Sequence, residues 1–114
     1  MAYDEDLANR IRELVAAESG VAEQRMFGGL AFLIDGNMSV AASGQGGLLV
    51  RADPAEAAAL VDDPHVTPMV MGGREMRGWL NVTLDAVRSD EALRTWVTRG
   101  VAFARTLPAK AKRL

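Results

Sequence analysis

The first segment of the chain, residues 4–19, repeats its apolar positions at the spacing of an amphipathic helix. Acidic residues occupy the first turn, where they suit the positive end of the helix dipole, and Gly20 is placed to end the helix. The apolar stripe that we expect to face the core consists of Leu7, Ile11, Leu14 and Val15. The pattern therefore predicts a helix over residues 4–19.

From residue 21 to residue 51 the helical spacing gives way to short apolar runs separated by glycine-containing turns, which is typical of an antiparallel meander. A short segment over 22–27 leads into Gly28 and Gly29. Asp35 and Gly36 stand between two apolar runs, which is a strong signal of a tight hairpin. Strands are predicted at 30–35, 38–43 and 48–51.

Two further helices are predicted in the second half of the chain. Asp53 can cap a helix over 54–62, and the last helix begins after Ser89 and ends before Pro108. Gly100 stands inside that last helix at a cost of about 1 kcal/mol relative to alanine, and close approach of the helix to a sheet would explain it. The buried stripe expected there consists of Leu93, Trp96, Val97, Val101, Ala104 and Leu107.

Two strands complete the pattern. The run 66–71 contains Pro68, which favours the edge of a sheet, and Gly73 turns the chain toward a strand at 79–83. The predicted order is α-β-β-β-α-β-β-α. It indicates an α+β domain with a mostly antiparallel sheet of about five strands and helices packed on one face.

Composition narrows the classes of function. The 114 residues contain no cysteine, which excludes disulfides, thiol nucleophiles and thiolate metal ligands, and the formal net charge is −2. No apolar run is long enough to span a bilayer, and the acidic start of the chain does not resemble a secretory signal. We therefore expect a cytoplasmic protein that does not associate with membranes.

The residue types used in catalysis are sparse. His65 is the only histidine, and it follows an Asp-Asp-Pro segment that is typical of a loop. No serine stands in a nucleophile-elbow sequence, and no second acidic cluster could complete a metal site with His65. We expect no catalytic residues, no metal, no cofactor and no enzyme activity.

Four arginines form the best candidate patch for an anion or a partner. They are Arg25, Arg51, Arg74 and Arg77, and each flanks a predicted strand. Guanidinium groups beside exposed backbone N–H groups could hold a carboxylate or a phosphate. The alternative is surface ion pairing, for instance of Arg74 with Glu23 or of Arg77 with Glu75.

The methionines also cluster near predicted strands. They are Met26, Met38, Met69, Met71 and Met76. Methionine fills irregular gaps in cores, and it is also frequent on adaptable binding surfaces. We expect core positions, with a groove between the sheet and a helix as the alternative.

Three blocks of sequence resemble the N-terminal domain of the TfoX/Sxy family of competence regulators. The first is Arg25, Met26, Phe27, Gly28 and Gly29 with the following apolar strand and the Gly36 turn; the second runs from Gly73 through Gly78 to Trp79; the third runs from Trp96 through Arg105 to Pro108. The resemblance is closest to short, single-domain bacterial members. It covers most of the chain and implies a single domain over residues 1–114, with a core at about 5–108 and a basic tail at 109–114.

The resemblance implies an α+β fold similar to the secretion chaperones and the YjbR-type proteins. It also implies a non-catalytic regulatory domain that binds a protein, since full-length members act with a cyclic-AMP receptor-type activator on DNA-uptake genes. Those members carry a second, C-terminal domain that this sequence does not contain.

Two alternative functions remain. One is a nucleic-acid-associated regulator that uses Arg74, Arg77 and the basic tail. The other is a small-molecule binder or enzyme with an arginine-lined cavity. A homodimer is also expected, because related folds pair and the edge strand that contains Pro68 leaves a sheet margin to be covered.

Overall fold

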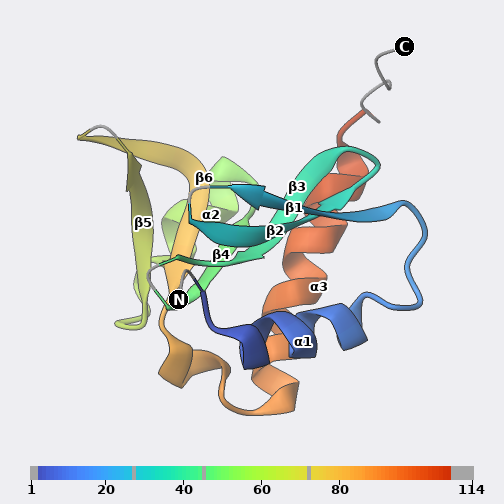
Figure 1. The fold of residues 1–114 in the computed structure, drawn as a ribbon. Coiled ribbons are helices and arrows are strands. Elements are labelled where there is room, and N and C mark those ends of the chain that lie inside the picture. Colours follow the sequence, from blue (N-terminus) through green and yellow to red (C-terminus); the bar gives the residue numbers. More distant parts are fainter. Residues whose placement is uncertain (1–2, 27, 45, 72, 109–114) are drawn as a thin grey trace.

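The computed structural model describes residues 3–26, 28–44, 46–71 and 73–108. Three α-helices and one six-stranded antiparallel sheet make up the described part (Figure 1). In chain order the elements are α1 (Glu5–Leu14), β1 (Val21–Met26), β2 (Gly29–Ile34), β3 (Asn37–Ala42), β4 (Leu48–Arg51), α2 (Pro54–Leu60), β5 (Val66–Met71), β6 (Arg74–Val82), the 3-10 helix η1 (Leu84–Val87) and α3 (Asp90–Thr106). The α+β class and the element order are confirmed, with six strands rather than about five.

The strands lie in the order β1-β2-β3-β4-β6-β5, and every neighbouring pair is antiparallel. Strands β1 to β4 pair with one another in chain order, and β5 pairs with β6. Strand β4 pairs with β6, across the intervening α2 and β5. The two margins of the sheet are β1 and β5. The strand that contains Pro68 is therefore an edge strand, as its proline predicts.

The predicted hairpin turn is present between β2 and β3. Asp35 and Gly36 both have positive φ angles, 51° and 84°, and they form the two-residue connection between Ile34 and Asn37. Two positive φ angles in a two-residue loop give the twist that matches flanking antiparallel strands.

Two elements differ from the prediction by about five residues at one end, and one element was not predicted. Helix α1 ends at Leu14 rather than near residue 19, because the apolar stripe stops at Val15 and residues 16–20 are exposed. Strand β6 begins at Arg74 rather than at residue 79, since its polar first half pairs with β5 as a protruding hairpin arm. The helix η1, which packs against α3, was not predicted.

The main core lies between the sheet and the helices on one face. Helix α3 packs on β2, β3 and β4, α1 contacts both α3 and β3, and α2 packs on β6 (Figure 1). Alternate strand residues point into this core, as the pleat of a strand requires. Its largest fully buried side chains are Phe32, Leu7, Ile11, Ile34, Leu48, Leu80 and Leu93.

Gly100 lies where α3 approaches strand β3 closely. A Cβ atom at this position would lie 2.6 Å from the Ser39 carbonyl oxygen and 2.7 Å from Cγ1 of Val40. Both distances are far below van der Waals contact, so only glycine fits between the helix and β3. The helix tolerates this residue of low helix propensity because glycine allows α3 to pack closely on β3.

Strand β6 contains a wide irregularity opposite β5. Pro68 pairs with Leu80 and Val70 pairs with Glu75, so four residues of β6 stand opposite Met69 alone. Gly78 lies in this segment with a φ of 82°, and its carbonyl oxygen accepts a hydrogen bond from the Ala52 N–H at 2.7 Å. Irregularities of this kind bend a strand and increase its twist.

Replacing Gly100 with alanine should destabilise the protein even though alanine is the better helix former. The added Cβ would overlap the β3 backbone, and we expect a net loss of about 1–3 kcal/mol in the free energy of unfolding after the helix gain of about 1 kcal/mol. Urea denaturation followed by circular dichroism measures this change. Thr98→Ala is the matched control on the exposed side of α3, and an equal loss in both variants would contradict the close-packing explanation.

Candidate functional site

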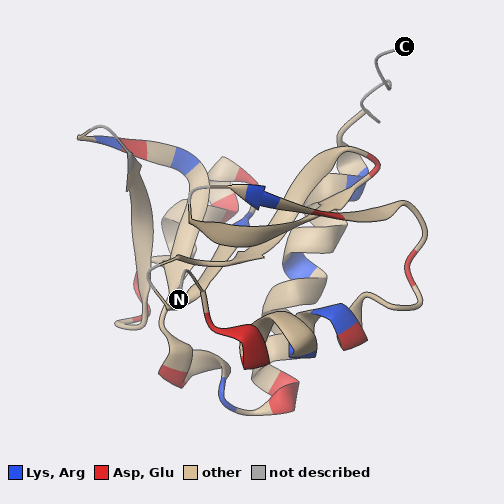
Figure 2. Cartoon of the chain, viewed as in Figure 1, with Lys and Arg blue, Asp and Glu red and all other residues tan. Residues whose placement is uncertain are grey.

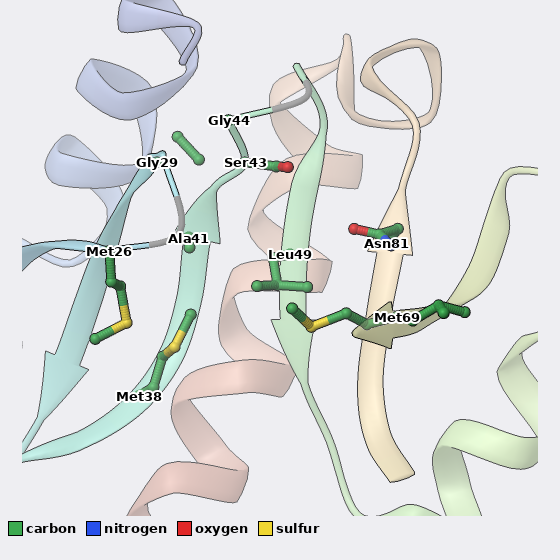
Figure 3. Close-up of a pocket in the computed structure, with 11 residues that line it drawn as sticks. Met26, Gly29, Met38, Ala41, Ser43, Gly44, Leu49, Met69 and Asn81 are labelled. Atoms are coloured by element: carbon green, nitrogen blue, oxygen red, sulfur yellow. The ribbon is translucent and has the colours of Figure 1, made fainter. Parts of the chain in front are cut away.

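A hollow of about 160 Å³ lies on the face of the sheet that the helices do not cover (Figure 3). Its side chains come from five strands, and α3 lies behind the sheet in this view. The apolar lining consists of Met26, Met38, Ala41, Leu49 and Met69, with Asn81 and Ser43 contributing polar groups.

The residues of this face form a second, smaller apolar cluster. Ala31, Met38, Ala41 and Leu49 are buried, although no helix lies over them, and Met26 and Met69 are half-buried against them. Register shifts occur in the β2–β3 pair and in the β5–β6 pair. Such irregularities bend and twist strands, and the half-buried side chains of Met26, Leu33, Met69 and Trp79 pack against the central residues and shield them.

The methionines divide between the core and the surface. Met38 is buried in the second apolar cluster, which agrees with the expected core position, and Met26 and Met69 are half-buried against it on the helix-free face. Met76 is 37% exposed beside α2, and the side chain of Met71 lies outside the described residues. Sequence spacing could not assign the face, because each strand offers two and only the register selects one.

The four arginines lie at separate positions around the sheet. Arg25 is on β1, which three strands separate from β6 in the sheet order, and Arg74 begins β6 at the tip of the β5–β6 hairpin. Arg77 lines a second hollow of about 270 Å³ between α2 and β6. Figure 2 shows basic and acidic residues alternating at the hairpin tip, whereas β2 and β3 carry no charge.

Arg51 is held by aromatic rings. Its guanidinium carbon lies 5.1 Å from the centre of the Trp79 ring and 5.7 Å from that of Phe103. Cation–π contacts of this kind orient the side chain at the end of β4. The hollow on the helix-free face is the methionine hollow, named for Met26, Met38 and Met69. Its lining does not include Arg25, Arg51 or Arg74.

The remaining motif residues serve turns and strands. Gly28 is exposed with a φ of 76°, and Gly29 is buried at the start of β2. Gly73 lies in the β5–β6 turn with a φ of 80°. Trp79 is half-buried against the second apolar cluster. Phe27 lies outside the described residues.

His65 Nδ1 is 2.8 Å from the Thr83 hydroxyl, and the described part of the chain holds no group of three acidic or histidine side chains able to bind a metal.

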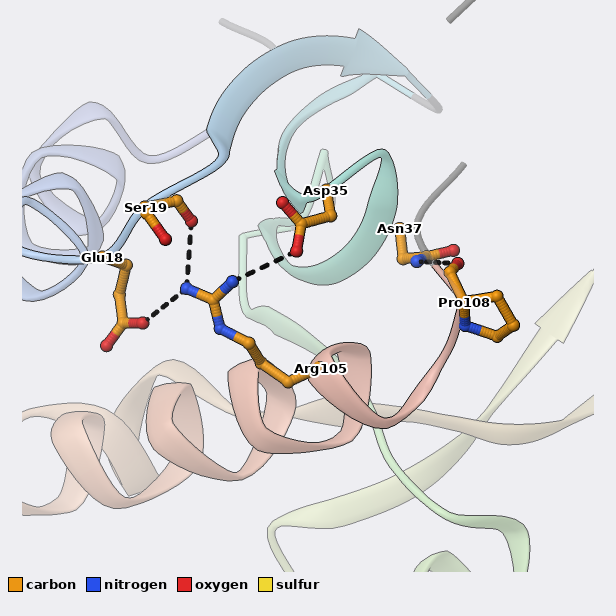
Figure 4. A network of polar contacts seen from close by, with 6 residues as sticks. All are labelled: Glu18, Ser19, Asp35, Asn37, Arg105 and Pro108. Atoms are coloured by element: carbon orange, nitrogen blue, oxygen red, sulfur yellow. Dashed lines mark hydrogen bonds and ion pairs between the residues drawn. The ribbon is translucent and has the colours of Figure 1, made fainter. Parts of the chain in front are cut away.

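Arg105 joins three segments that are distant in the sequence (Figure 4). It donates hydrogen bonds to the Glu18 carboxylate at 2.8 Å, the Ser19 carbonyl at 2.9 Å and the Asp35 carboxylate at 3.2 Å. The hydrogen bond to Glu18 is the largest cause of the raised pKa of Arg105. The end of α3 is thereby tied to the α1–β1 loop and to the β2–β3 turn, and nearby Asn37 donates to the Pro108 carbonyl at 2.9 Å. Arg105 is part of the third sequence block, but only the structure shows what it joins.

Glu23 on β1 pairs with Arg12 of α1 rather than with Arg74. Arg12 donates two hydrogen bonds to the two carboxylate oxygens of Glu23, at 2.6 and 2.8 Å. These hydrogen bonds are the main cause of the lowered pKa of Glu23. The ion pair ties the edge strand to α1.

The fold defines a class of protein: a small α+β domain in which helices cover one face of the sheet and leave the other, apolar face uncovered. A family model described as the TfoX N-terminal domain matches residues 13–104, and the chain belongs to this family. The resemblance in the three sequence blocks is thus confirmed, and it marks the chain as a regulatory, competence-related type of domain. No curated protein and no solved structure matched the chain. None of the helices in the described ranges is long and apolar enough to cross a bilayer.

Replacing Glu23 with glutamine should lower the free energy of unfolding at neutral pH, and the loss should shrink in acid. The pKa of Glu23 is lowered by folding, so the unfolded chain binds more protons in the acidic range and stability rises with pH there. The contribution is complete above the unfolded pKa of about 4.3 and disappears as the pH falls through the folded value.

Urea denaturation of both proteins between about pH 7 and pH 3 tests this dependence. Glu13→Gln removes the same charge from neighbouring α1 without touching the ion pair and serves as the control. A difference between wild type and Glu23→Gln that stays constant down to the lowest pH would contradict the assignment.

Proposed function

We propose that this domain is a non-catalytic regulator that binds a partner protein through its helix-free sheet face. The observation that carries the proposal is the hollow lined by Met26, Met38 and Met69, which interrupts a face with no helix over it. Methionine side chains are flexible and polarisable, so they adapt to apolar side chains of a partner. The occupant that fits is an apolar segment of a protein.

Two further features support this function. The strands that form the floor of the hollow, β2 and β3, carry no charged residue, so the face offers little to a phosphate backbone. The hollow has only about 160 Å³ and is bordered by strand residues, which suits the insertion of one or two side chains better than a drug-sized ligand. We propose the transcription machinery as the source of the partner, because the full-length competence regulators that the sequence resembles act with a cyclic-AMP receptor-type activator.

Met69→Lys and Met26→Lys each place a charge in the hollow at a half-buried position. We expect capture of the partner by the tagged protein to fall at least about tenfold in both variants, as for a residue at the centre of an interface. Met76→Lys is the matched control, because Met76 is exposed on β6 outside the methionine hollow. Circular dichroism checks that all three variants fold.

The capture is run from cytoplasmic extract with and without nuclease and at two salt concentrations. A protein that survives both treatments, depends on Met69 and Met26 but not on Met76, and rebinds after purification supports the proposal. Recovery of nucleic acid that washes away in salt would instead favour a nucleic-acid regulator. Capture unaffected by all three substitutions would rule out the methionine hollow.

A further inference from the structure

The outer edge of β1 is a strand margin that faces no other strand of the described chain. Four consecutive residues, 22–25, are exposed, and the strand contains no proline and no irregularity in its pairing with β2. An unpaired margin of this kind is a template for another strand. The opposite margin is less suitable, because β5 contains Pro68 and shifts its register beside it.

We propose that two copies of the chain pair through their β1 strands as an antiparallel, two-fold dimer with Gln24 opposite Gln24. Each Glu23 then faces Arg25 of the second copy. The two sheets become one continuous sheet, and the interface is self-complementary, as a two-fold contact requires.

The backbone of β1 selects which residues can pair outward. The Asp35 N–H donates to the Gly20 carbonyl at 2.9 Å, and the same register continues along β1 and β2. Residues that bond to a neighbouring strand alternate along an antiparallel pair. Gln24 therefore directs its N–H and C=O groups toward β2, and Glu23 and Arg25 direct theirs outward. A two-fold pairing must place these outward residues opposite one another.

Among the registers centred on residues 23, 24 and 25, charge then selects one. Centring the pair on residue 23 would place two glutamates opposite each other, and centring it on residue 25 would place two arginines there. Centring it on Gln24 places Glu23 opposite Arg25 twice, once on each side of the axis. Opposite charges across strands stabilise the pairing, and like charges directly opposite destabilise it. Exposed charges on an edge strand disfavour pairing with an unrelated strand, and like charges disfavour the two shifted registers. Pairing with a second copy centred on Gln24 is favoured, because its charges are complementary.

The side-chain faces agree with this arrangement. Arg25 pairs with Leu30 of the main core, so Glu23 and Arg25 lie on the helix-covered side, where Arg12 already binds Glu23. Each Glu23 would thus lie between Arg12 of its own chain and Arg25 of the second copy. Met26 lies on the other face, so the two methionine hollows would open on the same side of the joined sheet.

The test is the mass of the purified full chain in sedimentation experiments over a range of concentrations. We expect a reversible dimer, weakened at least about tenfold by Arg25→Glu, which sets glutamate against glutamate at both pairs, and likewise by Glu23→Arg. An equimolar mixture of the two variants should restore dimers, because every pair is then complementary. Arg74→Glu is the control, since it changes the charge equally at the tip of the β5–β6 hairpin, away from β1.

Arg25→Pro provides a second test that does not depend on charge. It removes an outward N–H while leaving the β1–β2 bonds in place, so it should abolish the dimer without unfolding the monomer. A wild-type chain that stays monomeric at every concentration would overturn the proposal. So would a dimer that Arg25→Glu and Arg25→Pro leave unchanged, or variants that fail to recover on mixing. These measurements involve no partner protein and are independent of the methionine hollow.

Discussion

The packing of α3 on the sheet is the contact on which the rest of the structure depends. Gly100 brings the helix backbone against β3, and the buried stripe from Leu93 to Ala104 covers β2, β3 and β4 from one side. Helices α1 and α2 join the same side, so apolar burial is concentrated in one layer. The opposite face is left to its own side chains, and this asymmetry leaves one face of the sheet without a covering helix among the described elements.

Much of the fold could be predicted from the sequence because its local signals agree with one another. The Asp35–Gly36 turn, the Asp53 and Ser89 caps and the proline of the edge strand all do what their chemistry dictates. The prediction was wrong where local pattern carries little information. The first half of β6 is polar on both faces, and it is a strand only because β5 lies beside it.

The candidate site was less predictable, because it depends on register rather than on residue type. Methionines and arginines are visible in the sequence, but whether Met38 faces a helix or the open side is decided by strand pairing and by a one-residue shift within it. The edge charges Glu23 and Arg25 are likewise unremarkable until the direction of each backbone group is known. Arg105 illustrates the same limit, since its partners lie 70 and 87 positions away in the chain.

The strand order has a consequence for how the molecule folds and opens. Strands β1 to β4 follow one another as hairpins, so four of the six strands pair through contacts that are local in the sequence. The β5–β6 hairpin joins this meander through the β4–β6 ladder, which must close the longest loop in the sheet. Within this unit β5 is the edge strand, bonded to β6 alone, and it carries Met69. Local opening of β5 would therefore change the width of the methionine hollow while the core residues of β6 stay in place.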